Sequence, residues 1–216
     1  MFQSIIKTGA VRACSGCKII LLLVLTVMLV SCLDISAAVT ITEDSGIQVQ
    51  LRYQLSAFMI QLAKTSDFAS YLPVPASYDE LVQKVGGFTG VTISENSSAV
   101  SNAVQCQLDF PNIETMAAFF ESQALELIPG TEGVNALRLI INGPALVAGT
   151  MMSENNELKS YIETVFASSN AALSFTGGGL IISGTGFSTV DNVLVYSSPI
   201  NNLIFMENPV LLDLSW

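Results

Sequence analysis

The sequence contains four cysteines, whose thiols are its most reactive side chains, at positions 14, 17, 32 and 106. Cys14 and Cys17 form a Cys-Ser-Gly-Cys stretch, a spacing used by redox-active and metal-binding pairs. A structural zinc site needs four ligands, and the sequence has neither a second such pair nor any histidine. We therefore predict that Cys14 and Cys17 bind no metal and perform no redox chemistry.

The absence of histidine removes whole classes of catalysis. Without an imidazole there can be no Ser-His or Cys-His nucleophile pair and no imidazole-based metal site. The 18 carboxylic side chains could still act in pairs, as in glycosidases, but no local motif selects two of them. We predict no enzymatic activity and no cofactor, and we keep a carboxylate-based enzyme as an alternative.

Cys106 lies in an alternating segment, Ala103 to Phe110, in which Val104 and Leu108 share its face. This pattern predicts a strand whose thiol packs as a small buried hydrophobe and does not act as a nucleophile.

Two glycine-containing segments invite ligand-binding interpretations that their details do not support. Gly177 to Gly186 reads GGGLIISGTG, but it lacks the Lys-Ser/Thr end of a phosphate loop and the third glycine of a dinucleotide fingerprint. Asp44-Ser45-Gly46 is too short for a calcium loop. Both segments are predicted to be turns between strands.

Cys32 lies near the end of an uncharged run of 15 residues, Ile19 to Leu33, with Lys7, Arg12 and Lys18 before it. A helix needs about 20 apolar residues to cross a bilayer, so the run is too short for a comfortable membrane span. A basic start, a short apolar core and small residues after it are typical of an export signal. We predict a signal peptide over residues 1–31 and a single domain over 32–216.

The four residues Leu29-Val30-Ser31-Cys32 resemble the lipobox of bacterial lipoproteins, with an aliphatic residue three before the cysteine and a small residue directly before it. The resemblance implies that the Cys32 sulfur receives a diacylglyceryl group and that the peptide is cut before Cys32. It also implies that the new N-terminus is often acylated. Two or three acyl chains hold a protein persistently on a membrane, whereas one chain holds it only marginally.

Two other fates of the signal remain open. Ser36-Ala37-Ala38 fits the small-x-small rule, so an ordinary signal peptidase could cut after Ala38 and release a soluble secreted domain. A retained signal anchor is the other. If Cys32 is lipidated, Leu33 follows it where an aspartate would favour inner-membrane retention by resemblance to enterobacterial sorting, so the outer membrane or the cell surface is favoured.

The charge balance after the signal excludes some partners. Residues 32–216 contain five basic and eighteen acidic side chains, a net charge of −13. Such a surface repels nucleic acid and anionic lipid headgroups. We therefore exclude nucleic-acid partners and membrane attachment through basic residues, which leaves the lipid on Cys32 as the expected membrane contact.

Alternation and capping signals predict the elements of the domain. Val39 to Thr42 and Ile47 to Gln54 form a hairpin, and Thr89 to Glu95 and Ala103 to Phe110 form a second one. Helices are predicted from Leu55 to the Pro73 break, after the Ser77 capping box, from Ile113 to Pro129, and from Ser153 to Ser168. Strands follow from Ala136 to Ile141 and through the glycine-rich tail to Trp216.

Half of all residues are apolar and 12% are charged, which is typical of a folded domain with one membrane-directed segment. Strands outnumber helices, and helices stand between consecutive hairpins. The predicted fold class is α+β, with an antiparallel sheet of several hairpins and three to four helices packed on one face.

The layout has a further resemblance. Cys32-Leu33-Asp34 leads directly into a strand, an acidic-Gly turn and a second strand, and a terminal strand ends at Trp216, which looks like the domain of LppM-like bacterial lipoproteins. The resemblance implies a mixed sheet packed by helices and a role in handling lipid or glycolipid. Many members also have a C-terminal transmembrane helix, whereas this sequence ends at Trp216. No binding residue of the family matches a motif here, so none is carried over.

The leading hypothesis is a lipid-anchored, non-enzymatic protein of the cell envelope. We expect it to bind a partner protein, or an apolar or lipid ligand, near the membrane. The short tether after Cys32, the apolar composition and the missing catalytic motif motivate this interpretation. The alternatives are a soluble secreted domain, a carboxylate-based envelope enzyme, and a purely structural protein without a ligand.

Overall fold

The structure is a computed structural model of the whole chain. It describes residues 34–55, 74–75, 77–95, 103–122, 124–130, 135–142, 160, 163–164 and 166–216. The predicted signal peptide, Cys32, most of the helix predicted after Leu55 and most of the helix predicted after Ser153 lie outside these residues.

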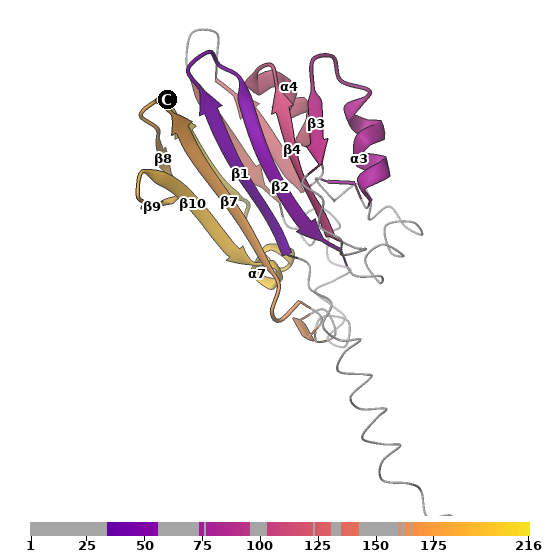
Figure 1. Cartoon of the computed structure of the whole chain (residues 1–216). Helices are drawn as coiled ribbons and strands as arrows, with labels where there is room; N and C mark the ends of the chain where they lie inside the picture. Colours follow the sequence, from indigo (N-terminus) through magenta and orange to yellow (C-terminus); the bar gives the residue numbers. More distant parts are fainter. Residues whose placement is uncertain are drawn as a thin grey trace, which may run out of the picture. The chain divides into compact units, whose positions relative to one another are not determined.

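Within the described residues, seven strands form one sheet in the order β3-β4-β2-β1-β7-β10-β9 (Figure 1). Their bounds are β1 Asp34–Thr42, β2 Ile47–Gln54, β3 Thr92–Glu95, β4 Ala103–Phe110, β7 Asn170–Gly178, β9 Ser188–Val190 and β10 Val193–Pro199. All neighbours pair antiparallel except β1 and β7, which run parallel.

Strand β1 occupies the centre of this sheet. It forms the predicted hairpin with β2, in which Ile41 pairs with Ile47 across a turn where Ser45 adopts a positive φ of 66°. The strand begins at Asp34, five residues earlier than the alternation from Val39 predicted. On its other side β1 pairs with β7, with Ile35 opposite Ala171. The strand therefore has hydrogen-bonded neighbours on both edges.

A second sheet contains four described strands in the order β5-β6-β11-β8. These are β5 Leu125–Pro129, β6 Ala136–Ile141, β8 Ser183–Thr185 and β11 Val210–Ser215, and all pair antiparallel. The predicted alternation at the C-terminus is confirmed, because Leu212 and Leu214 of β11 are buried whereas Leu211 and Ser215 are exposed.

The apolar sides of both sheets belong to one hydrophobic core. Its largest fully buried members include side chains of β1, β2, β4, β6 and β7 and of the helix α4 Ile113–Phe120, among them Ile41, Leu51, Tyr53, Leu108, Phe119, Leu137 and Phe175. Aromatic rings from β4 and α4 meet edge to face, with 5.3 Å between the ring centroids of Phe110 and Phe119. We call the side of the seven-stranded sheet that enters this core its inner face.

Side-chain caps fix where the helices begin. The Ser77 hydroxyl accepts a hydrogen bond from the Glu80 amide at 3.3 Å and opens α3 Tyr78–Val85, as predicted. The Asn112 carboxamide accepts from the Thr115 amide at 2.8 Å and opens α4. A third short helix, α7 Ile200–Ile204, follows β10 in a tail that the sequence predicted as strands only.

The α+β fold class is confirmed, but the predicted end of the second capped helix is wrong. The helix expected to run from Ile113 to Pro129 ends at Phe120, and the residues after it form strand β5. Helical spacing of Phe120 and Ala124 suggested continuation, whereas Leu125 and Leu127 alternate with Glu126 and pair with β6 in the second sheet. No described helix is long and apolar enough to span a bilayer.

Gly186 takes the chain from the second sheet to the first. It lies between β8 and β9 with a φ of +84°, a conformation that favours glycine. A Cβ there would stand 2.6 Å from Leu212 Cδ2 and 2.9 Å from the Leu211 carbonyl oxygen. The next residue, Phe187, packs edge to face on Phe175 at 5.6 Å between ring centroids. This corner therefore needs a residue without a side chain.

Replacing Gly186 by alanine should destabilise the domain by about 1–3 kcal/mol, because the added Cβ meets backbone and the positive φ strains an L-residue. Urea unfolding followed by circular dichroism measures the change. Gly86→Ala is the matched control, since φ is −60° there and the nearest heavy atom is 3.4 Å away, so its effect should stay below about 1 kcal/mol. Equal effects of the two substitutions would contradict this role of Gly186.

Candidate functional site

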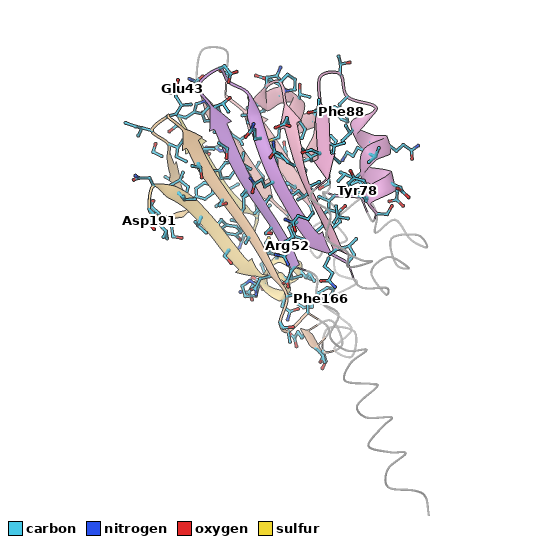
Figure 2. All side chains as sticks on the ribbon, in the orientation of Figure 1. Glu43, Arg52, Tyr78, Phe88, Phe166 and Asp191 are labelled. Atoms are coloured by element: carbon cyan, nitrogen blue, oxygen red, sulfur yellow. The ribbon has the colours of Figure 1, made fainter. Side chains whose placement is uncertain are left out.

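The side of the seven-stranded sheet opposite the core, called here the outer face, carries no described helix or strand over it (Figures 1 and 2). Alternation along each strand determines its composition, since successive side chains point to opposite faces. In β2, Ile47 and Leu51 are buried whereas Gln48 and Gln50 are exposed. On its four central strands the outer face consists of Asp34, Ser36, Ala38, Thr40, Gln48, Gln50, Arg52, Gln54, Ala103, Gln105, Gln107, Asp109, Ala172, Ser174 and Thr176.

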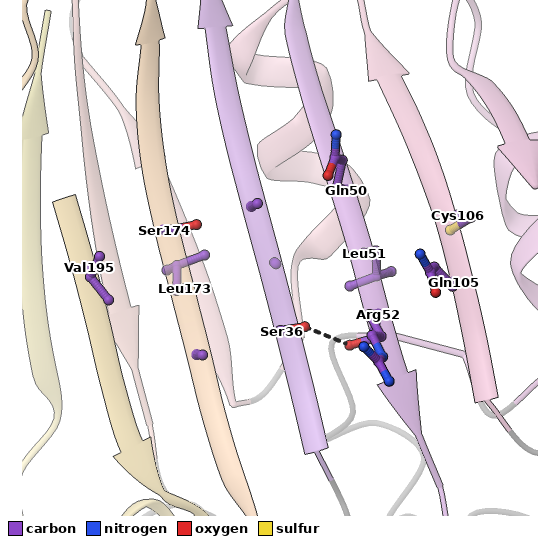
Figure 3. Close-up of a pocket in the computed structure, with 12 residues that line it drawn as sticks. Ser36, Gln50, Leu51, Arg52, Gln105, Cys106, Leu173, Ser174 and Val195 are labelled. Carbon is purple, nitrogen blue, oxygen red and sulfur yellow. Dashed lines mark hydrogen bonds between the residues drawn. The ribbon is translucent and has the colours of Figure 1, made fainter. Parts of the chain in front are cut away.

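A hollow with a volume of about 240 Å³ lies in the middle of this face (Figure 3). Small side chains from β1 and β7 form its floor, namely Ser36, Ala38, Ala172 and Ser174. Longer side chains rise beside the floor, namely Gln50 and Arg52 of β2, Gln105 of β4 and Val195 of β10. The hollow therefore exists because two neighbouring strands carry small residues between strands that carry large ones.

The floor is placed by strand register. Ser36 and Ala38 of β1 pair with Ala172 and Ser174 of β7, so the small residues lie side by side across the parallel pair. The Ser36 hydroxyl also donates to the Arg52 carbonyl oxygen at 3.4 Å, which links β1 to β2 beside the hollow (Figure 3).

The two acidic side chains of the outer face accept hydrogen bonds from other residues of the domain. Asp34 Oδ1 accepts the Asn170 amide at 3.1 Å, at the start of β7. Asp109 accepts from Gln107 Nε2 at 2.9 Å and from Thr92 Oγ1 at 3.4 Å. Neither carboxylate lines the hollow. The Arg52 guanidinium is therefore the charged group of the hollow.

A second, larger hollow of about 660 Å³ lies on the second sheet. Its lining includes Ile128, Arg138 and Asp213. Arg138 binds Asp213 with both arms of its guanidinium, at 2.6 Å from Nε and 3.2 Å from Nη2, and this pairing lowers the pKa of Asp213 and raises that of Arg138. Because these charges neutralise each other, this hollow presents no free charge from that pair.

The residues singled out from the sequence have different outcomes. Cys32, Cys14 and Cys17 lie outside the described residues, so lipidation of Cys32 stays a prediction. The glycine segment is a turn only in part, since Gly179 and Gly186 lie between strands, whereas Gly177 and Gly178 belong to β7 and Gly184 belongs to β8. No cluster of three potential metal ligands occurs among the residues that the structure describes.

Cys106 is buried, as predicted, with 2% of its surface exposed. Burial raises the pKa of its thiol to about 11, because the thiolate would lose its hydration in the core. An unfolded cysteine titrates near pH 8.5, so the burial stabilises the folded state fully below that pH. The contribution is lost as the pH rises towards 11. Since the Cys106 side chain points to the inner face, Cys106 can line the hollow only with its backbone atoms.

Sequence reasoning did not select the hollow. It placed Gln50, Arg52 and Gln105 on the polar side of their strands, which the structure confirms. The available signal was a row of glutamines with one arginine on two paired strands. That row became a site only through β7, whose pairing with β1 joins residues more than 130 positions apart.

Comparison with known proteins gives one structural neighbour. The sequence matches no protein-family model, and no curated protein matches it significantly. The NMR structure of the folded domain of LppM from Mycobacterium tuberculosis is similar over 85% of this chain and 88% of that chain, with 12% identity and a TM-score of 0.43.

Iodoacetamide at pH 8 should leave Cys106 of the folded protein essentially unmodified, because the thiol is buried and stays protonated. In 6 M urea, on the order of the concentrations that unfold small domains, the same residue should react within minutes. Mass spectrometry of the peptide containing Cys106 measures both rates. Rapid modification under native conditions would contradict a buried structural thiol.

Proposed function

We propose that this chain is a lipid-anchored, non-enzymatic protein of the bacterial cell envelope that binds a partner protein on the outer face. Strand β1 is the observation that carries the proposal. It begins at Asp34, two residues after Cys32, and its residues Ser36 and Ala38 form half of the floor of the hollow. One strand therefore connects the predicted anchor to the candidate binding surface.

The position of β1 also favours cleavage before Cys32 over cleavage after Ala38. Residues 34–38 of β1 pair with residues 50–54 of β2 on one side and, from Ile35 on, with β7 on the other. A cut after Ala38 would remove more than half of a central strand and expose the edges of both neighbours, which sheets avoid. Cleavage before Cys32 leaves the strand whole, which supports the lipobox interpretation.

A short tether follows from the same geometry. Asp34 is the second residue after Cys32, and an extended chain covers about 3.5 Å per residue, so the sheet begins within about 7 Å of the Cα atom of Cys32. The domain is thus expected to stay beside its membrane. In this proposal the domain lies at the outer membrane or at the cell surface.

The chemistry of the outer face favours a protein partner over an apolar ligand there. The side-chain amides of Gln50 and Gln105 and the hydroxyl of Ser174 offer hydrogen bonds. The hollow, at about 240 Å³, is smaller than the roughly 300 Å³ of ordinary small-molecule pockets. A protein partner can cover a broad sheet face and place one side chain in the hollow. The absence of histidine from the sequence is consistent with binding without catalysis.

The anchor is tested by Cys32→Ser in the full chain expressed in a bacterial host. The wild-type protein should take up radioactive palmitate and sediment with the envelope, whereas the variant should lose the label, because serine gives no thioether. Cys14→Ser is the matched control and should keep both properties. A Cys32→Ser protein that stays labelled would refute the anchor.

The binding surface is tested by photocrosslinking in intact cells. A benzoylphenylalanine at Gln48, an exposed residue of the outer face outside the hollow, should give a discrete protein adduct. Ala38→Trp should reduce the adduct at least about tenfold, since the indole fills the hollow from an exposed position of β1 without entering the core.

The same photoprobe at Leu211, which is 52% exposed on the second sheet, serves as the control and should give no such adduct. Equal adducts from positions 48 and 211, or an adduct insensitive to Ala38→Trp, would argue against the outer face as the binding surface.

A further inference from the structure

We propose that the hollow of the outer face binds a carboxylate of the partner protein, and that Arg52 is the residue that recognises it. This inference rests on the proposed function, because it names the chemical group that the partner presents to the outer face. The acceptor is an Asp or Glu side chain, or a chain terminus, inserted between β2 and β7.

The first argument is how the domain uses its positive charges. Arg138 is occupied by Asp213, and the Lys84 ammonium lies 4.7 Å from the centre of the Phe119 ring. Arg52 is the other basic residue among those the structure describes, and its guanidinium has no carboxylate or aromatic partner there. Among the described residues, this acidic domain thus leaves one basic side chain without a partner, on its open face.

The second argument is the surroundings of Arg52. Its register partners are Ser36 on β1 and Gln105 on β4, and its neighbours two residues away on β2 are Gln50 and Gln54. None of these four is acidic, so no direct neighbour neutralises the guanidinium. The nearby carboxylate of Asp34 is bound to the Asn170 amide on β7. No acidic side chain among the described residues therefore pairs with Arg52, and its guanidinium is open to an acidic group of a partner.

The third argument is the set of donors around the hollow. A guanidinium offers two parallel N–H groups that match a carboxylate, and amide groups can supply further donors. Gln50, Gln105 and Ser174 line the hollow with Arg52. The Ser36 hydroxyl is already directed at the Arg52 carbonyl, which leaves the amides and the Ser174 hydroxyl available. A planar, singly charged acceptor fits this donor set.

The fourth argument limits the charge of the occupant. Residues 32–216 carry a net charge of −13, which repels polyanions at a distance. A single carboxylate on an otherwise neutral surface meets this repulsion least and can still pair with Arg52. The hollow therefore fits one acidic side chain or chain terminus better than a strongly anionic polymer.

The first test repeats the crosslinking from position 48 in variants of the full chain. Arg52→Gln should reduce the adduct at least about fivefold, because it removes the charge and the paired donors. Arg52→Lys should give an intermediate yield, because it keeps the charge but loses the planar fork. Arg138→Gln removes the same charge from the second sheet and should leave the yield unchanged.

The second test uses chemical probes on the purified protein at constant ionic strength. N-acetylglycine at about 50 mM, a concentration suited to weak exposed pairs, should shift the side-chain NMR signals of Arg52 and Gln105. N-acetylglycinamide, which lacks the charge, should not shift them, and Arg52→Gln should abolish the response. Inorganic phosphate is the comparison oxyanion and should have a smaller effect.

Several results would overturn the inference. These are equal shifts with the acid and its amide, a response to phosphate alone, or an adduct that Arg52→Gln leaves intact. The last result would leave the proposed function standing, because the partner would still contact the outer face. If the photoprobe at position 48 gave no adduct in the protein with Arg52 intact, that result would instead refute the proposed function itself.

Discussion

The double pairing of β1 is the constraint on which the rest of the structure depends. Its antiparallel pairing with β2 is local, since a turn of a few residues joins the two strands. Its parallel pairing with β7 brings residues 35–42 beside residues 171–178. Parallel strands need a long crossover, and the chain between β1 and β7 contains the second hairpin, α4 and two of the four described strands of the second sheet, β5 and β6. The core shared by the two sheets follows from this crossover.

Because side chains alternate along β1, the same strand serves two environments. Val39 and Ile41 enter the core, whereas Ser36 and Ala38 stay at the open surface. Small outward residues are tolerated there because the stability of the strand comes from its buried side and from hydrogen bonds on both edges. The hollow is thus a consequence of residue size on β1 and β7 within a sheet whose inner side is tightly packed. It requires no loop or mobile element to form.

The sequence was sufficient for features that depend on near neighbours. Both hairpins, the Ser77 cap and the burial of Cys106 follow from alternation or from contacts within a few residues. It was insufficient where distant segments decide. Strand β5 was taken for a helix because its partner β6 determines its conformation, and the separation into two sheets depends on pairings that periodicity does not encode. The polar positions of Gln50 and Arg52 were predictable, whereas the hollow beside them needed the register of β7.

In the proposed function, the outer face must both stay soluble and bind a partner, and its composition fits both requirements. Charged side chains would keep an open sheet face soluble, but covering them with a partner would cost their hydration. The central strands here instead carry mainly amides, hydroxyls and small residues, whose desolvation costs less when hydrogen bonds replace water. The carboxylates of Asp34 and Asp109 already accept hydrogen bonds within the sheet, which replace part of their hydration. Against this neutral background a single guanidinium has a large effect, because it is the one feature of the hollow that distinguishes an acidic group from a neutral one.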